Sequence, residues 1–169
     1  MGRKTRELTL ISFLSVVIAI SGIFKLPGLI PGTEFQMTAP IAIGICATFG
    51  FKRYIYSGII ASFINLLMGT NTILNIIVAM IFRVVAGGLI GIFGSSISVV
   101  TIAGPVGTFI GRIIMSFITG ASLKALIFAA SIGMVYTGIS SYLVFKLIKN
   151  ITINTSYKEF IVRKNKFKR

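Results

Sequence analysis

Two arginines stand inside long apolar stretches of the sequence, where charged residues are rare. Arg83 lies near the middle of residues 73–94, and Arg112 lies within residues 98–119. An arginine at the centre of a membrane helix costs roughly 2.5 to 3.5 kcal/mol on insertion scales, so it normally faces a protein interior, a water-filled cavity or a partner. Because a guanidinium offers paired N–H donors to planar anions, both arginines are candidates for binding a carboxylate or a similar anion.

Each arginine also has a purely structural interpretation. Arg83 would bind backbone carbonyls freed by a kink at Gly104-Pro105, and Arg112 would extend towards the outer membrane interface. Gly104-Pro105 is expected either to kink its segment or to divide it into two half-helices. The helical face of Arg112 carries further residues at helical spacing, namely Thr101, Thr108, Met115 and Thr119. Both interpretations of each arginine stay open at this stage.

Four more polar residues are candidates for the same pocket. Asn75 falls on the Arg83 side of its segment, Asn71 precedes that segment, and Glu34 and Gln36 lie in the first external loop. Only three residues of the chain are acidic, namely Glu7, Glu34 and Glu159, and histidine is absent. Paired carboxylates for acid–base catalysis, a Ser-His-Asp triad and the commonest transition-metal ligand are therefore missing. The sequence predicts neither enzymatic activity nor a metal site.

Asn65 and several glycines indicate contacts inside the protein. Asn65 lies in an apolar segment, and a buried amide needs polar partners in lipid. Gly107 and Gly111 are four residues apart, a spacing that lets neighbouring helices approach closely.

The composition is that of a membrane protein. Of 169 residues, 55% are hydrophobic and the mean hydropathy is +0.97, which is more apolar than a soluble domain of this length could bury. The net charge is +14, but most cations flank apolar segments, where they attract anionic head groups. We therefore expect contact with membrane lipid and no nucleic acid, and we predict an all-α integral membrane protein.

Six apolar segments are candidate membrane helices: residues 8–24, 37–51, 54–68, 73–94, 98–119 and 123–148. Cations cluster at both ends of the chain and at Lys52-Arg53, and the positive-inside rule places these clusters in the cytoplasm. We predict six transmembrane helices with both termini cytoplasmic. Residues 1–150 would form the membrane domain, and residues 151–169 would form a basic cytoplasmic tail.

This layout resembles that of S components, the substrate-binding subunits of energy-coupling factor (ECF) vitamin transporters. The resemblance covers residues 8–149 and rests on the six segments and three short motifs: Ser15-xxx-Ala19, Gly69-Thr-Asn-Thr72 and Gly104-Pro-x-Gly107. It implies a multi-pass protein of the bacterial plasma membrane, without enzymatic activity, that captures a vitamin or vitamin precursor outside the cell.

The resemblance also implies partners and site residues. Ser15 and Ala19 would contact the transmembrane coupling subunit, although Ser15 departs from the alanine usual in the family. That subunit sits on two ATPases, so ATP would be used by the partners and this chain would carry no cofactor. The pocket would bind a micronutrient with an anionic or electron-rich group through Arg83, Arg112, Asn71, Asn75, Glu34 and Gln36.

Two other classes of protein remain open. A small oligomeric channel or holin-like pore would use the arginines to line an anion path, and a structural assembly partner would bind no ligand at all. The sequence leaves the substrate open, because S components share an architecture while their pockets diverge.

Overall fold

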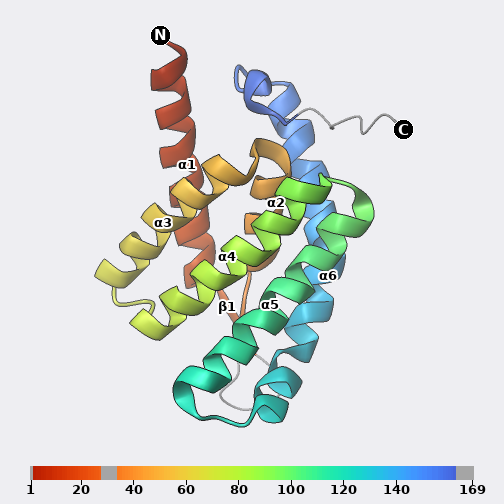
Figure 1. Cartoon of the computed structure of the whole chain (residues 1–169). Helices are drawn as coiled ribbons and strands as arrows, with labels where there is room; N and C mark the ends of the chain where they lie inside the picture. Colours follow the sequence, from red (N-terminus) through yellow and green to blue (C-terminus); the bar gives the residue numbers. More distant parts are fainter. Residues whose placement is uncertain (1, 28–33, 163–169) are drawn as a thin grey trace.

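The chain folds into a bundle of helices with one short hairpin (Figure 1). The computed structural model describes residues 2–27 and 34–162, and it describes side chains for residues 2–24 and 37–162. The elements are α1 (Arg3–Ile23), β1 (Lys25–Pro27), β2 (Glu34–Gln36), α2 (Thr38–Phe49), α3 (Phe51–Leu67), α4 (Ile73–Phe93), α5 (Ile97–Thr119), α6 (Leu123–Ile153) and the 3-10 helix η1 (Lys158–Phe160). Strands β1 and β2 pair antiparallel, with Leu26 opposite Phe35.

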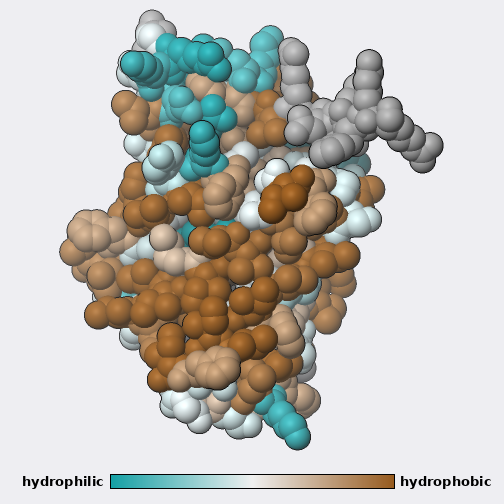
Figure 2. Space-filling view, viewed as in Figure 1, coloured by the Kyte–Doolittle hydropathy of each residue, from teal (hydrophilic) through white to brown (hydrophobic). Residues whose placement is uncertain are grey.

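Four of the described helices, α1, α4, α5 and α6, are long and apolar enough to cross a membrane. Helix α2 is apolar but has only 12 residues, and α3 has 17. Figure 2 shows apolar side chains over most of the visible face and hydrophilic ones gathered at the end where α1 begins. Each predicted apolar segment is therefore a helix, whereas the number that cross the membrane stays a prediction.

The connection between α2 and α3 is a single residue. Gly50 has a φ of +88°, a left-handed conformation that glycine adopts at little cost, and it ends α2 with its amide bonded to the Cys46 carbonyl at 2.9 Å. The predicted basic turn at Lys52-Arg53 is therefore wrong in detail, because both residues already belong to the first turn of α3. The charges of Lys52 and Arg53 did not locate the turn, because the single residue Gly50 forms it.

Helix α5 runs unbroken through Pro105, so of the two expected alternatives, a kink and a division into half-helices, the division is wrong. The neighbouring helix passes closely at this point: a Cβ on Gly138 of α6 would lie 3.4 Å from the Thr101 carbonyl oxygen and 3.5 Å from the Pro105 ring. Pro105 has no N–H to donate to the Thr101 carbonyl, and Gly138 lets α6 pack closely beside that carbonyl. Helix α6 itself continues to Ile153, beyond the predicted end at residue 148.

Small residues let the helices approach closely, as their spacing predicts. Helix α2 lies innermost, with residues 42–49 all buried. Gly107 and Gly111 of α5 face α4, because a Cβ on Gly107 would lie 3.0 Å from the Phe82 ring and one on Gly111 would lie 3.4 Å from Val78. This close contact brings the polar faces of α4 and α5 to the same interior space.

The two ends of the described chain meet at the basic end of the bundle. Arg6 and Glu159 form an ion pair at 2.8 Å, and Arg53 and Glu7 form another at 2.7 Å. The Phe160 side chain is buried, and the Arg53 guanidinium lies 4.9 Å from its ring centroid. Residues just after α6 are thus packed against the helices. The domain boundary at residue 150 stays a prediction.

Candidate functional site

A pocket of about 470 Å³ lies between the helices, away from the paired ends of the chain. All six α-helices contribute to its wall, and the size is within the usual range for small-molecule sites. Apolar and polar side chains both line the wall, and the polar ones come from α2 to α6 and from the turn before α4. Such a cavity suits a ligand with an apolar body and a few polar groups.

Arg83 extends from α4 towards α3 and is only 5% exposed. Its Nη1 donates to the Ser62 Oγ at 2.7 Å and approaches the Met80 Sδ at 3.3 Å. Gly58 of α3 makes room for the side chain, because a Cβ at that position would lie 2.4 Å from the Arg83 Nε. No backbone carbonyl accepts from Arg83 among the described hydrogen bonds, so the structural interpretation of Arg83 as a carbonyl clamp is not supported.

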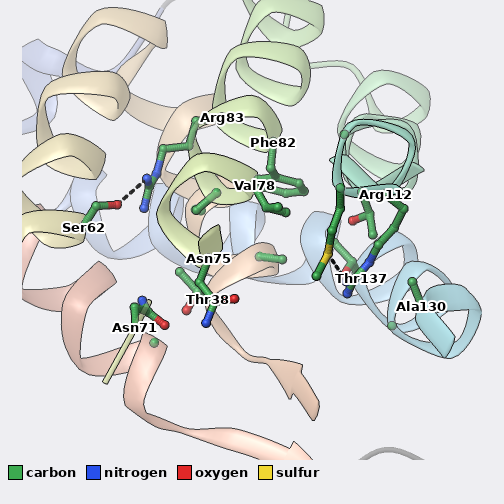
Figure 3. Close-up of a pocket in the computed structure, with 18 of the residues that line it drawn as sticks. Thr38, Ser62, Asn71, Asn75, Val78, Phe82, Arg83, Arg112, Ala130 and Thr137 are labelled. Carbon is green, nitrogen blue, oxygen red and sulfur yellow. Dashed lines mark hydrogen bonds between the residues drawn. The ribbon is translucent and has the colours of Figure 1, made fainter. Parts of the chain in front are cut away.

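Arg112 reaches the same pocket from α5. It is half-buried, and its Nη1 lies 3.4 Å from the Met115 Sδ, one turn along the helix. Figure 3 places Arg83 beside Ser62 at one side of the pocket and Arg112 at the other side. Thr108 and Met115, members of the predicted polar face of α5, also line the cavity. The two arginines therefore line one cavity. Their positions in the sequence alone did not show this.

The asparagines before and within α4 are also at the site. Thr72 caps α4, because its Oγ1 accepts a hydrogen bond from the backbone N–H of Asn75 at 3.3 Å. Asn71 and Asn75 both line the pocket. Glu34 and Gln36 belong to β2, which pairs with β1, but their side chains lie outside the described part of the structure. The roles predicted for Glu34 and Gln36 stay predictions.

Several pocket residues were not among the predicted ones. Four buried side-chain atoms lack a hydrogen-bond partner in the described structure, and all four line this pocket: Thr38 Oγ1, Tyr54 Oη, Asn65 Oδ1 and Asn71 Oδ1. Because buried polar groups are nearly always paired, their concentration here marks a place for polar groups of a ligand or for water. Asn65 carried a sequence signal as an amide in an apolar helix, whereas Thr38 and Tyr54 lie near helix starts, where polar residues are ordinary.

Ser15 and Ala19 are 1% and 4% exposed, so they pack inside the chain rather than on its surface. Helix α1 lies along α3 in this region, and the Ser57 Oγ donates to the Ile11 carbonyl at 3.2 Å. The exposed residues of α1 at this level are on another face and include Phe13 and Val16. The predicted contact of Ser15 and Ala19 with a coupling subunit stays untested, and their burial in this conformation is unfavourable to it.

Known proteins resemble this chain in sequence and in structure. Protein BioX of Lysinibacillus sphaericus is 45% identical over 145 residues, which are 86% of this chain and 87% of that protein. No protein-family model matches the sequence. The crystal structure of the S component for biotin from an ECF-type ABC transporter matches with a TM-score of 0.68, covering 96% of this chain and 100% of that one at 18% identity. The chain therefore belongs to the family of BioX, and it has the fold of the S component for biotin.

The match in fold agrees with the resemblance to S components predicted from the sequence. The fold and the long apolar helices indicate a multi-pass membrane protein. Capture of a vitamin without enzymatic activity, together with an ECF module, stays a prediction for this chain. The alternatives of a holin-like pore and of a structural partner without a ligand gain no support from these comparisons.

Proposed function

We propose that this S component captures a vitamin or vitamin precursor with an anionic group in the pocket between its helices. The observation that carries the proposal is Arg83, a cation 5% exposed within an apolar wall, with a serine hydroxyl and a thioether as its described partners. A guanidinium has five N–H donors, so most of its donors remain for a ligand. A carboxylate would pair with it in a charge-assisted, bidentate manner.

Biotin is the first vitamin to test. A solved structure that matches this chain is that of an S component for biotin. In sequence, the chain matches BioX. Biotin carries one carboxylate, which Arg83 would take, and a cyclic urea, which the unpartnered amides of Asn65 and Asn71 would bind. Arg112 and Asn75 would complete the polar contacts, with Glu34 and Gln36 contributing from the external hairpin.

Delivery into the cell would follow from the family's architecture. We propose that the substrate enters from outside, that both termini and the Lys52-Arg53 region are cytoplasmic, and that six helices cross the bacterial plasma membrane. A transmembrane coupling subunit and two ATPases would then drive uptake with ATP, while this chain carries no cofactor. The position of Arg6 and Glu159 in one ion pair supports an even number of crossings, because it brings both ends of the described chain to one side.

The proposal predicts that purified protein in detergent binds a carboxylate vitamin and that Arg83 is required. Thermal unfolding and isothermal titration with biotin and other vitamins would measure binding. Arg83→Gln should weaken binding about tenfold to a hundredfold, since a hydrogen bond to a charged group contributes about 1.5 to 3 kcal/mol. Arg83→Lys should recover only part of the affinity, because an ammonium cannot pair in a bidentate manner.

Lys124→Gln is the control, because this exposed cation does not line the pocket. It should leave affinity unchanged. If folded wild-type protein binds no carboxylate compound, or if the Arg83 variants bind as tightly as wild type, the proposed function is wrong.

A further inference from the structure

The pocket holds two cations rather than one. Arg83 enters from α4 and Arg112 enters from α5, and both line the same cavity of about 470 Å³. The described partners of Arg112 are limited to the Met115 thioether at 3.4 Å, a weak acceptor. Two guanidinium groups in one chamber repel each other and lose part of their hydration, so a bound anion beside either of them would be stabilised.

The chain has little negative charge to offer these arginines. Only three residues are acidic, and two of them are engaged at the opposite end of the bundle: Glu7 with Arg53 at 2.7 Å and Glu159 with Arg6 at 2.8 Å. None of the described pocket-lining residues is acidic. The remaining carboxylate is that of Glu34. Even if it formed an ion pair with one arginine, the other arginine could pair only with an anion from outside the chain.

The arginines also stand apart in the pocket. In Figure 3, Arg83 is beside Ser62 at one side of the view and Arg112 is at the other side. Val78 and Phe82 lie between them in this view, with the polar side chains of Asn75 and Thr38 below. A single small anion bound at one arginine would leave the other without an anion. The pocket therefore has a cation at each side and apolar side chains among the residues between them.

We propose that the substrate carries two carboxylates joined by an apolar chain, with Arg83 binding one carboxylate and Arg112 binding the other. This inference rests on the proposed function and narrows its substrate class from any anionic micronutrient to a straight-chain dicarboxylate. The apolar chain would lie against Val78 and Phe82, whose burial by the ligand adds affinity without a further polar contact. Biotin, with one carboxylate, would satisfy only one of the two cations.

The test compares each diacid with a partner that has lost one charge. Full-length protein in detergent is titrated calorimetrically with a series of straight-chain α,ω-dicarboxylates, with the monomethyl ester of each, and with biotin. The best diacid should bind about tenfold or more tighter than its own monoester and than biotin, a difference of about 1.4 kcal/mol.

Variants assign the second carboxylate to Arg112. In Arg112→Gln the affinity for the diacid should fall more than the affinity for its monoester, so that the preference for the diacid is lost. Lys124→Gln should preserve the full difference between diacid and monoester, which excludes a general effect of net charge. Thermal unfolding of each variant without ligand verifies that it is folded.

The results separate this inference from the proposed function. If biotin or a monoester binds as tightly as every diacid, or if Arg112→Gln keeps the preference for the diacid, the dicarboxylate inference is wrong while the proposed function stands. If no carboxylate compound binds to folded wild-type protein, both are wrong.

Discussion

At the scale of single residues, the pocket is defined by polar groups whose hydrogen-bonding capacity is not used within the chain. Arg83 is the extreme case, but Tyr54 is equally informative. Its ring is fully buried and its hydroxyl has no partner in the described structure. A buried hydroxyl without a partner costs about 1 to 3 kcal/mol, so its presence favours a role in the ligand-bound state.

Tyr54→Phe should therefore separate binding from stability. Removing the unpartnered hydroxyl should leave the ligand-free protein as stable as wild type or more stable, because the phenyl ring keeps the packing. The same change should weaken ligand binding severalfold and reduce the thermal shift that saturating ligand produces. Differential scanning fluorimetry with and without ligand measures both effects.

Ser57→Ala, one turn further along α3, is the opposite case. The Ser57 Oγ donates to the Ile11 carbonyl at 3.2 Å and does not line the pocket. Its loss should lower the unfolding temperature of the ligand-free protein and leave the ligand-induced shift unchanged. A Tyr54→Phe protein that is destabilised but binds normally would show that the hydroxyl has a structural role only.

At the scale of elements, the contact between α3 and α4 positions Arg83. Gly58 lies directly against the Arg83 side chain, so α3 can approach α4 while the guanidinium stays between them. The Ser62 hydroxyl, one turn later on α3, then holds the Arg83 Nη1 at 2.7 Å. Thus one face of α3 both admits the cation and orients it.

Gly58→Ala should displace Arg83 and reduce ligand affinity about tenfold or more. The new Cβ would lie 2.4 Å from Nε and 2.5 Å from Cδ, which requires the arginine side chain or the helix to move. Overpacking of this kind costs about 1 to 3 kcal/mol, so the unfolding temperature should also fall. Titration calorimetry and thermal unfolding measure the two consequences.

Gly88→Ala on α4 is the matched control. A Cβ on Gly88 would have no neighbour within 4 Å, so affinity should not change and stability should stay the same or rise slightly. Equal effects of the two substitutions would argue against a specific contact between Gly58 and Arg83.

At the scale of the whole molecule, the charges divide the protein into a basic end and a pocket end. Arg6, Arg53, Glu7 and Glu159 join the start of α1, the start of α3 and the segment after α6. The pocket-lining residues Gly22 and Asn65 come instead from the far ends of α1 and α3. The cytoplasmic orientation of the basic end would place the pocket nearer the outside.

Cysteine labelling of intact cells tests this orientation. A membrane-impermeant maleimide should label Lys124→Cys and should not label Lys52→Cys, because Lys124 lies at the start of α6 and Lys52 lies at the basic end; both side chains are exposed. The native Cys46 is 1% exposed and gives a silent background. Labelling of Lys52→Cys in intact cells, with Lys124→Cys protected, would reverse the proposed topology.

The sequence by itself determined the membrane class and the existence of six helices, and it predicted a role for Arg83 that stays a prediction. These follow from local chemistry. A long apolar segment forms a helix in lipid, and a charged side chain inside it needs a polar or charged partner or water. The resemblance to S components also came from the sequence, and the match in fold agrees with it. The turn at Gly50 differed from expectation, and of the two alternatives at Pro105 the division into half-helices was wrong, because both features depend on neighbouring backbone.

Only the tertiary structure decided which polar groups share a cavity. Arg83 and Arg112 lie on different helices, and their common pocket depends on the close approach of α4 and α5 at Gly107 and Gly111. Packing of α1 along α3 buries Ser15 and Ala19, to which the resemblance to S components had given a contact with a partner. Spacing along one helix fixes which residues share its face, whereas what that face meets is set by how all the helices pack together.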